Sequence, residues 1–319
     1  MLDKLIHFLK SADGYISGEE ISRSFNISRA GIWKHIQELR SLGYEFEAVP
    51  HLGYKLVSSP DRLFPSEIKF QLKTKKIGEH IIYYDTISST MDEAFRLAVD
   101  GAEEGTVICA EGQSKGRGRL GRTWSSPKGK GIDVSIILRP QVSPNAVSQI
   151  TLLSAVAVCE AIKNASGLTA AIKWPNDLLI NGKKCVGILT EMNAEIDRIK
   201  FVTVGIGVNV NTAANQLLPH ATSLKNETRQ NFSRVELLQE ILRRIEYWYL
   251  QFQGKGFGEV VEKWKELSST LGKHIRIVNA GQSIEGKAID LDEDGGLVIR
   301  QDNTGTIIKK MTGDVVQIM

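Results

Sequence analysis

Several features are scarce or missing in this chain of 319 residues. Its three cysteines, at positions 109, 159 and 185, lie singly in apolar segments and form no C-x-x-C pair, which favours buried thiols over a disulfide or a metal site. No apolar run is as long as a membrane span, and the first residues lack the pattern of a signal peptide. We therefore expect a cytoplasmic protein that uses no membrane and holds no metal by protein ligands alone.

The overall charge also excludes a class of function. A formal net charge of +3 is too small to indicate that nucleic-acid binding is the only function of the chain. The sequence has no internal repeat, low-complexity tract or acidic tail, and it lacks the G-x-x-x-x-G-K-[ST] motif of phosphate-loop NTPases. With 42% hydrophobic residues, the chain is long enough for two or three domains with proper cores.

The densest charge lies in residues 116–122, Gly-Arg-Gly-Arg-Leu-Gly-Arg, which we call the arginine loop. Residues 112–132 contain six basic residues and no acidic one. Glycines allow backbone N–H groups to turn toward a ligand, and arginine forks suit phosphate or carboxylate. The pattern predicts an anion-binding loop, with a mobile, solvated basic loop as the alternative.

The arginine loop also matches the dinucleotide fingerprint G-x-G-x-x-G. That fingerprint must open a helix whose N-terminus receives the pyrophosphate. Residues 122–131 instead have the composition of a loop, and the flanking runs 105–110 and 132–138 are typical of strands. The sequence therefore predicts an anion-binding loop of another kind.

The N-terminal residues predict a small DNA-binding domain. Residues 2–9, 19–25 and 29–43 have helical patterns, with Ser28 as an N-cap and Gly43 at the end of the third helix. Residues 46–56 predict a hairpin, and residues 1–57 together resemble winged helix-turn-helix domains. The alternative is a small α+β interaction domain, since residues 1–59 hold seven basic and seven acidic residues. The residues expected to contact DNA are Ser28, Arg29, Ala30, Trp33, Lys34 and Gln37.

The rest of the chain alternates helices and strands. Residues 58–66 are typical of a linker, and a helix is expected to continue to about residue 76. A strand over 80–87 leads into a helix over 90–99, which Thr90 and Glu93 are expected to start as a capping box. Further helices are predicted over 147–162, 233–253 and 258–268, a central strand over 201–211, and short strands of a small barrel from 271 onward.

Residues 171–189 predict a hairpin with functional side chains. Asn181 and Gly182 between apolar runs indicate a type I′ turn, and Pro175 places Asn176 and Asp177 at a sheet edge or cleft. By alternation Lys184 would share an apolar strand face with Val186 and Ile188, so we expect an anionic partner for it. The alternative is a lysine that extends to water.

These motifs, in this order and spacing, closely resemble biotin protein ligases. With the winged helix in front, the resemblance is to bifunctional biotin ligases that repress the biotin operon. It implies an α+β chain with a winged helix-turn-helix at 1–59, a mixed-sheet catalytic domain of class II synthetase-like fold at 60–270, and an SH3-like barrel at 271–319.

The resemblance also implies a reaction and its partners. ATP and biotin, with Mg²⁺, would give biotinyl-5′-AMP, and a lysine of biotin carboxyl carrier protein would take the biotinyl group. Biotinyl-5′-AMP would also promote a homodimer that binds operator DNA. Since no side chain has the character of a covalent nucleophile, catalysis would depend on positioning.

Site roles follow only by family analogy. Ser89, Thr90 and Gln113 would bind the ureido ring, and Trp124 would pack on the adenine side. Arg119 and Lys184 would be the catalytic residues, at the reacting carboxylate and phosphate. Asn176 and Asp177 would orient the adenylate or its metal. The remaining predicted binding residues are Gly116, Arg117, Gly118, Arg122 and Gly205.

Two rival functions stay open at this point. A lipoate-type ligase of the same fold would need a longer apolar slot and usually lacks a DNA-binding domain. A ligand-sensing transcription factor without catalysis, or a nucleic-acid binder that uses the arginine loop, is the more distant alternative.

Overall fold

A computed structural model describes residues 1–279 and 282–318. Residues 280, 281 and 319, which belong to the predicted C-terminal barrel, lie outside the described residues. The chain divides into two compact units, residues 1–71 and 72–319.

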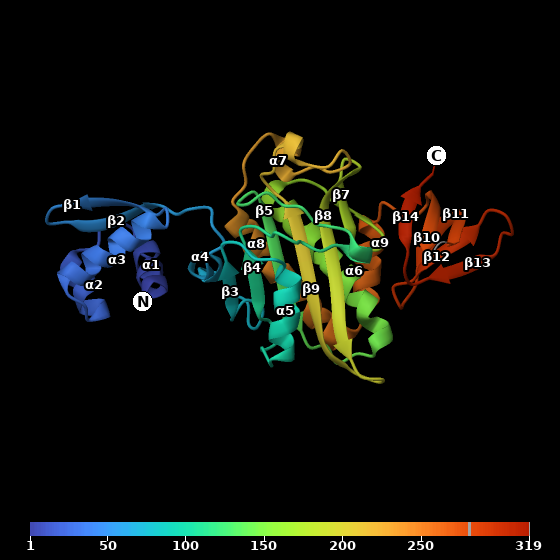
Figure 1. Cartoon of the computed structure of the whole chain (residues 1–319), viewed down its shortest axis with the longest axis horizontal. Helices are drawn as coiled ribbons and strands as arrows, with labels where there is room; N and C mark the ends of the chain where they lie inside the picture. The colour runs from blue at the N-terminus through green and yellow to red at the C-terminus, as the bar shows by residue number, and fades with distance from the viewer. Residues whose placement is uncertain (280–281, 319) are drawn as a thin grey trace. The chain divides into compact units, whose positions relative to one another are not determined.

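The first unit is a winged helix-turn-helix (Figure 1). Ser17 and Ser28 cap its second and third helices by accepting hydrogen bonds from backbone amides, and Asn26 makes the left-handed turn between them. Apolar side chains from all three helices form one core. The elements are α1 (Leu2–Lys10), α2 (Gly18–Phe25), α3 (Arg29–Ser41), β1 (Glu45–Val49) and β2 (Gly53–Ser58).

A short helix, α4 (Pro65–Lys69), completes this unit. Buried Glu67 pairs with Lys10 of α1 and accepts a hydrogen bond from the Tyr44 hydroxyl at 2.8 Å. Burial and this carboxylate raise the pKa of Tyr44. The predicted continuation of the helix to residue 76 was wrong, because Gln71 and Lys73 have positive φ angles of 58° and 57°.

The second unit is built on a mixed sheet of seven strands, in the order β3-β4-β5-β9-β8-β7-β6. Only the β3–β4 pair of this sheet is parallel within the described residues. Residues 199–209 form a central strand, as predicted. The strands are β3 (Ile81–Tyr84), β4 (Val107–Ala110), β5 (Gly131–Leu138), β6 (Ala171–Lys173), β7 (Asp177–Ile180), β8 (Lys183–Ala194) and β9 (Ile199–Asn209).

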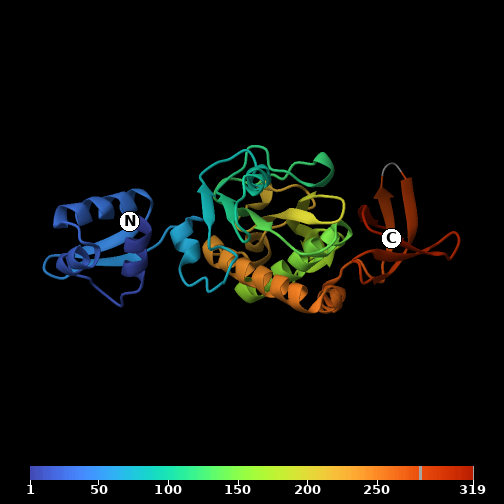
Figure 2. The same ribbon diagram turned by 90° about the horizontal axis from the view of Figure 1, so that it is seen from below.

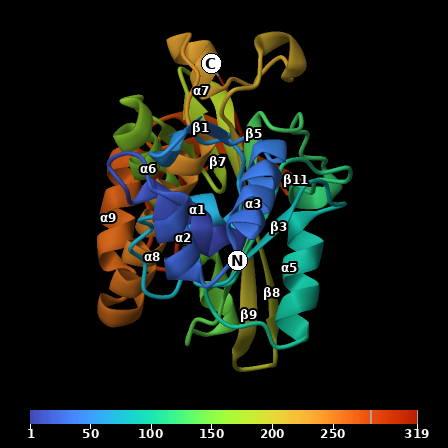
Figure 3. The same cartoon turned by 90° about the vertical axis from the view of Figure 1, so that its left-hand side faces the viewer.

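Helices cover the two faces of this sheet unequally. Helix α5 (Thr90–Val99) lies on one face, while α6 (Val147–Ser166), α8 (Arg234–Lys255) and α9 (Gly258–Leu267) lie on the other (Figures 2 and 3). A short α7 (Leu224–Thr228) follows β9. Contrary to the prediction from the sequence, the stretch Pro144–Ser166 has the length and hydropathy of a membrane span. Most of its apolar window is buried inside the unit, as expected for a core helix.

The start of α5 differs from the predicted capping box. Ser89, not Thr90, is the N-cap, and its hydroxyl accepts a hydrogen bond from the Asp92 amide at 3.4 Å. Glu93 instead accepts from the Tyr84 hydroxyl and pairs with Arg96. Thr90 is therefore a residue of the first helical turn, with its side chain available to the sheet.

The C-terminal segment, predicted as a small barrel, forms a β domain of short strands. It is a five-stranded antiparallel sheet in the order β13-β12-β11-β10-β14. Its strands are β10 (His274–Asn279), β11 (Gln282–Leu291), β12 (Leu297–Gln301), β13 (Ile307–Lys310) and β14 (Asp314–Gln317).

Candidate ligand-binding site

A cavity of about 710 Å³ lies on the α5 side of the seven-stranded sheet; we call it the ligand cavity. Its floor contains Gly205 and Gly207 of β9 and Gly187 of β8, which is paired with Gly207. A Cβ on Gly207 would lie 2.3 Å from the indole of Trp124, and one on Gly205 would lie 2.6 Å from a methionine sulfur. The glycines of β9 thus allow side chains to approach the strand backbone closely.

One end of the cavity carries a cluster of hydroxyl and amide groups. Both the backbone N–H and the hydroxyl of Thr90 donate to Gln113 Oε1, at 2.8 and 3.2 Å. The Ser135 hydroxyl of β5 donates to Thr90 Oγ1 at 2.9 Å. Ser89 is fully buried as the helix cap and is absent from the cavity lining. The structure thus brings Thr90 and Gln113 together and gives Ser89 a supporting position.

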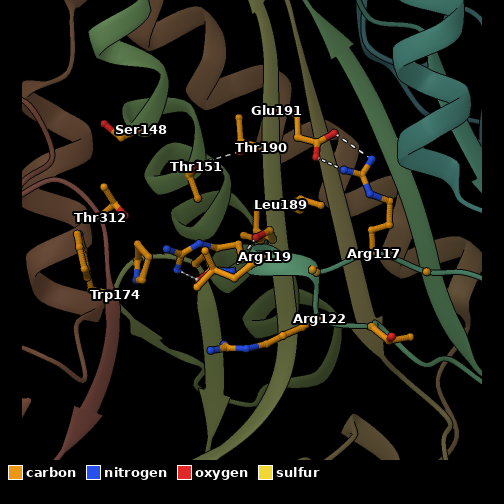
Figure 4. Close-up of a pocket in the computed structure, with 18 of the residues that line it drawn as sticks. Arg117, Arg119, Arg122, Ser148, Thr151, Trp174, Leu189, Thr190, Glu191 and Thr312 are labelled. Carbon is orange, nitrogen blue, oxygen red and sulfur yellow. Dashed lines mark hydrogen bonds and ion pairs between the residues drawn. The ribbon is translucent and has the colours of Figure 1, made fainter. Parts of the chain in front are cut away.

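The arginine loop lines the ligand cavity, and carboxylates or amides from distant segments hold its arginines. Figure 4 shows these arginines in a second pocket, which the loop also lines together with Ser148 and Thr151 of α6. Arg117 pairs with Asp92 of α5 and Glu191 of β8. Arg122 pairs with Asp314 of β14. Of the predicted site glycines, Gly118 lines the cavity; Gly116 does not, but it allows a close approach to the Trp124 carbonyl.

Arg119 is the most deeply placed cation of the loop. It donates to Asn176 Oδ1 at 3.0 Å and to the Gly313 carbonyl at 3.3 Å. Desolvation lowers the pKa of Arg119, although Asp314 and Asp177 act in the opposite direction. A partly dehydrated guanidinium favours an anionic ligand that adds charge-assisted hydrogen bonds.

Lys184 has the anionic partner that the sequence predicted. Its Nζ lies 2.7 Å from Asp177 Oδ1 and 5.7 Å from the ring centroid of Trp124. The predicted strand face was wrong, because the β7–β8 register shifts at Leu178/Leu179 and brings the Lys184 stem beside Gly187 on the cavity side. The hairpin turn is as predicted, with positive φ at Asn181 and Gly182.

Asn176 and Asp177 are fixed at the edge hairpin, where β7 follows β6. The Asn176 amide donates to the Ile188 carbonyl at 2.8 Å while its oxygen holds Arg119. Asp177 neutralises Lys184. Both residues therefore orient cations directly, within the protein itself.

Asp133 is a cavity residue that the sequence reading missed. It lies on β5 opposite Gly207 and accepts a hydrogen bond from the Trp124 indole at 3.0 Å. Desolvation raises the pKa of Asp133 to about 6. The available signal was a lone carboxylate within the otherwise apolar run 132–138.

The predicted DNA-contact residues share the outer face of α3. Trp33 is 59% exposed, and Arg29 and Lys34 are also exposed, while Ile32 and Ile36 are buried on the opposite face. Ser28 accepts from the Gly31 amide at 3.1 Å and fixes the start of the helix. Of the two remaining residues, Ala30 is exposed and Gln37 is half-buried.

Three family models match the chain: an HTH domain at residues 2–55, the Biotin/lipoate A/B protein ligase family at 83–211, and the Biotin protein ligase C terminal domain at 270–316. The bifunctional ligase/repressor BirA of Bacillus subtilis (strain 168) is 43% identical over 308 residues, 95% of this chain and 94% of that protein. This chain belongs to the biotin protein ligase family.

More distant relatives also match this chain. The bifunctional ligase/repressor BirA of Escherichia coli (strain K12) is 26% identical over 99% of this chain and 96% of that protein. The structure of biotin protein ligase from Aquifex aeolicus in complex with biotin and ATP is similar with a TM-score of 0.64 and 29% identity, and the match covers 75% of this chain and 99% of that one. The predicted family and fold class are confirmed.

Proposed function

We infer that the chain is a bifunctional biotin protein ligase and transcriptional repressor that uses ATP and biotin. The observation that supports the ligase reaction is the ligand cavity, where three cations from two segments, Arg119, Arg122 and Lys184, meet a buried hydroxyl–amide cluster. Such a site suits a reaction between two anions, a carboxylate and a nucleoside triphosphate.

In the first step, the biotin carboxylate attacks the α-phosphorus of ATP, giving biotinyl-5′-AMP and releasing pyrophosphate. We assign the hydroxyl–amide cluster at Thr90 and Gln113 to the ureido ring, because it presents donors and an acceptor in a buried place. Arg119 and Lys184 would stabilise the charge that develops on phosphorus. Trp124 would pack against the adenine.

No cluster of three or more metal-ligating side chains occurs in the described residues. Asp177, the one carboxylate of the edge hairpin beside the cations, is paired with Lys184. Mg²⁺ therefore fits this site best as part of the MgATP substrate, held by phosphate oxygens.

In the second step, the lysine of a biotin carboxyl carrier protein attacks the biotinyl carbonyl, and AMP leaves with its electron pair. The neutral amine has to reach the carbonyl without a covalent enzyme intermediate. The arginine loop would keep the adenylate from water until the acceptor arrives, since ordering the loop closes the cavity mouth. Because the carrier protein and the operator DNA would both be in the cytoplasm, we expect this activity there.

The first unit would bind operator DNA through the outer face of α3. Its balanced charge limits one copy to a few phosphate contacts, so a dimer that engages two half-sites is required for strong binding. Biotinyl-5′-AMP would promote that dimer by ordering the arginine loop. Sedimentation and operator titration with and without biotin plus ATP test this coupling, which is wrong if neither measurement responds.

An ATP–pyrophosphate exchange assay tests the enzymatic assignment. We expect exchange with biotin, and none with lipoate or without a carboxylate substrate. Exchange with lipoate alone would indicate a lipoate-type ligase, and no exchange with either would indicate a ligand sensor without catalysis.

A further inference from the structure

One buried carboxylate in the ligand cavity is bonded to residues from two different parts of the site. Asp133 is 2% exposed and accepts a hydrogen bond from the Trp124 indole at 3.0 Å. The side chains of Gln113 and Ser126 also hydrogen-bond to its carboxyl. A buried carboxylate of this kind fixes the orientation of each donor, because a donor that turned away would leave buried groups unpaired. Asp133 thus holds two residues of the cavity lining, Gln113 and Trp124, at the same time.

The bond with Gln113 joins Asp133 to the hydroxyl–amide cluster. Gln113 Oε1 accepts from the backbone N–H and the hydroxyl of Thr90 at 2.8 and 3.2 Å, so its Nε2 is the atom left to donate to Asp133. Ser135 follows two residues later on the same face of β5 and donates to Thr90 Oγ1 at 2.9 Å. Strand β5 therefore holds both members of the cluster.

The bond with the indole joins the same carboxylate to the wall beside a cation. The Trp124 ring lies over the glycine floor, where a Cβ on Gly207 or Gly187 would be 2.3 or 3.1 Å from it. Lys184 Nζ lies 5.7 Å from the ring centroid. Glycines offer no side chains to fix the angle of the ring, so the hydrogen bond from its N–H to Asp133 is the directional contact that orients it.

We propose that Asp133 is a positioning residue that couples the binding of biotin to the binding of ATP. Biotin on the hydroxyl–amide cluster fixes Gln113, and the shared carboxylate then holds the Trp124 indole ready for adenine. The second ligand binds more tightly because the first has already ordered this chain of side chains, and the gain is the same in either order. The inference rests on the proposed function, because it uses the ureido and adenine positions assigned there.

Calorimetric titration of the full chain with biotin, without and with a saturating ATP analogue, tests the coupling. The analogue carries a methylene group between the α- and β-phosphorus, so that no adenylate forms. The coupling factor is the ratio of the two biotin affinities, and it should be at least about fivefold in wild type.

Asp133→Asn breaks the link between the two parts of the site. The new amide oxygen still accepts from the Trp124 indole, but the new N–H₂ faces the N–H₂ of Gln113. The coupling factor should therefore fall below about twofold, while the biotin affinity without nucleotide changes by no more than about tenfold. Asp85→Asn is the matched control, because Asp85 is an exposed carboxylate that pairs with Lys128 outside the cavity lining. Its coupling factor should equal that of wild type.

A swapped pair separates positioning from general damage to the cavity. Asp133→Asn combined with Gln113→Glu restores one carboxylate and again matches a donor with an acceptor across the link. The coupling factor should return toward the wild-type value, and a changed biotin affinity of the double variant enters both titrations alike. A folded double variant that binds both ligands without coupling would leave Asp133 with a structural role only.

A second measurement follows the indole directly and applies even if Asp133→Asn does not fold. In protein labelled with 5-fluorotryptophan, Trp124→Phe identifies the fluorine resonance of Trp124. Biotin alone should shift that resonance in wild type and leave it unchanged in Asp133→Asn. An absent shift in wild type, a shift that persists in the folded variant, or an unaltered coupling factor would each overturn the proposal. Wild type that binds both ligands without coupling would overturn this inference alone, whereas wild type that binds neither would overturn the proposed function as well.

Discussion

The arginine loop and the β7–β8 hairpin both bring cations to the ligand cavity, but they hold them differently. Carboxylates on three other elements hold Arg117 and Arg122, and these contacts are partly exposed. Lys184 pairs with Asp177 on the adjacent strand of its own sheet. The hairpin therefore has its cation in place before a ligand binds, whereas the loop can exchange protein carboxylates for ligand anions.

The backbone supports the same distinction. Leu120 of the loop has a positive φ of 55°, which is uncommon for any residue other than glycine. Its side chain is also 74% exposed to solvent. The hairpin follows a regular ladder apart from one register shift. We infer that the hairpin provides the preorganised part of the first step and the loop the part that retains the intermediate.

The largest expected effect is on the hairpin. Lys184→Met keeps an apolar stem but removes the cation that we propose for the reacting phosphate, so the pre-steady-state rate of adenylate formation should fall about 100-fold. Lys183→Met, at the exposed neighbouring position, is the control and should keep the wild-type rate. A Lys184→Met rate within twofold of wild type would show that Lys184 is a surface lysine without a role in adenylate formation.

Arg119→Gly should affect retention more than formation, because other cations remain for the chemical step. Loss of a charge-assisted contact worth roughly 1.5–3 kcal/mol corresponds to a roughly 10- to 150-fold faster adenylate off-rate. A quenched chase measures that rate. Lys115→Gly, an exposed residue just before the loop, controls for added backbone freedom, and an unchanged off-rate in Arg119→Gly would contradict the comparison.

The first unit should respond independently of both segments. Lys34→Ala on the outer face of α3 removes one of the phosphate contacts that we propose, which should weaken operator binding by less than about tenfold and reduce the salt slope by about 1. Carrier-protein biotinylation should stay at the wild-type level. Lys4→Ala on α1, also exposed, is the control; an equal loss there would show that α3 is not the reading helix.

Short sequence motifs were enough to predict some of these structural features. The Asn181-Gly182 turn, the glycines of β9 and the basic arginine loop are each visible within a few residues. The register shift beside Lys184 was not visible, because it depends on pairing between strands rather than on alternation within one. It moved the lysine to the other face of the sheet.

The sequence also could not predict which distant residues pair with the arginines of the loop. Asp92, Glu191 and Asp314 hold the arginines from positions 25 to 192 residues away, and no local pattern assigns such pairs. Asp133 could have been noticed as a carboxylate in a buried strand, but its place in the cavity and its bond with the Trp124 indole are properties of the fold. Sequence patterns thus located segments that line the ligand cavity and not the partners of their side chains.

The smallest predicted effect tests the loop's restraint directly. Glu191→Gln keeps the shape of a β8 side chain but removes the charge that faces Arg117, and a partly exposed ion pair contributes up to about 1 kcal/mol. Hydrogen exchange of the amides at residues 116–122 should therefore speed up by no more than about fivefold, while the amides of β7 and β8 remain as protected as in wild type. Glu195→Gln is the control, because Glu195 pairs with Arg198 and Lys200 instead. Equal acceleration in loop and hairpin would mean that the two segments open together, and the division between a preformed and an exchangeable set of cations would then be wrong.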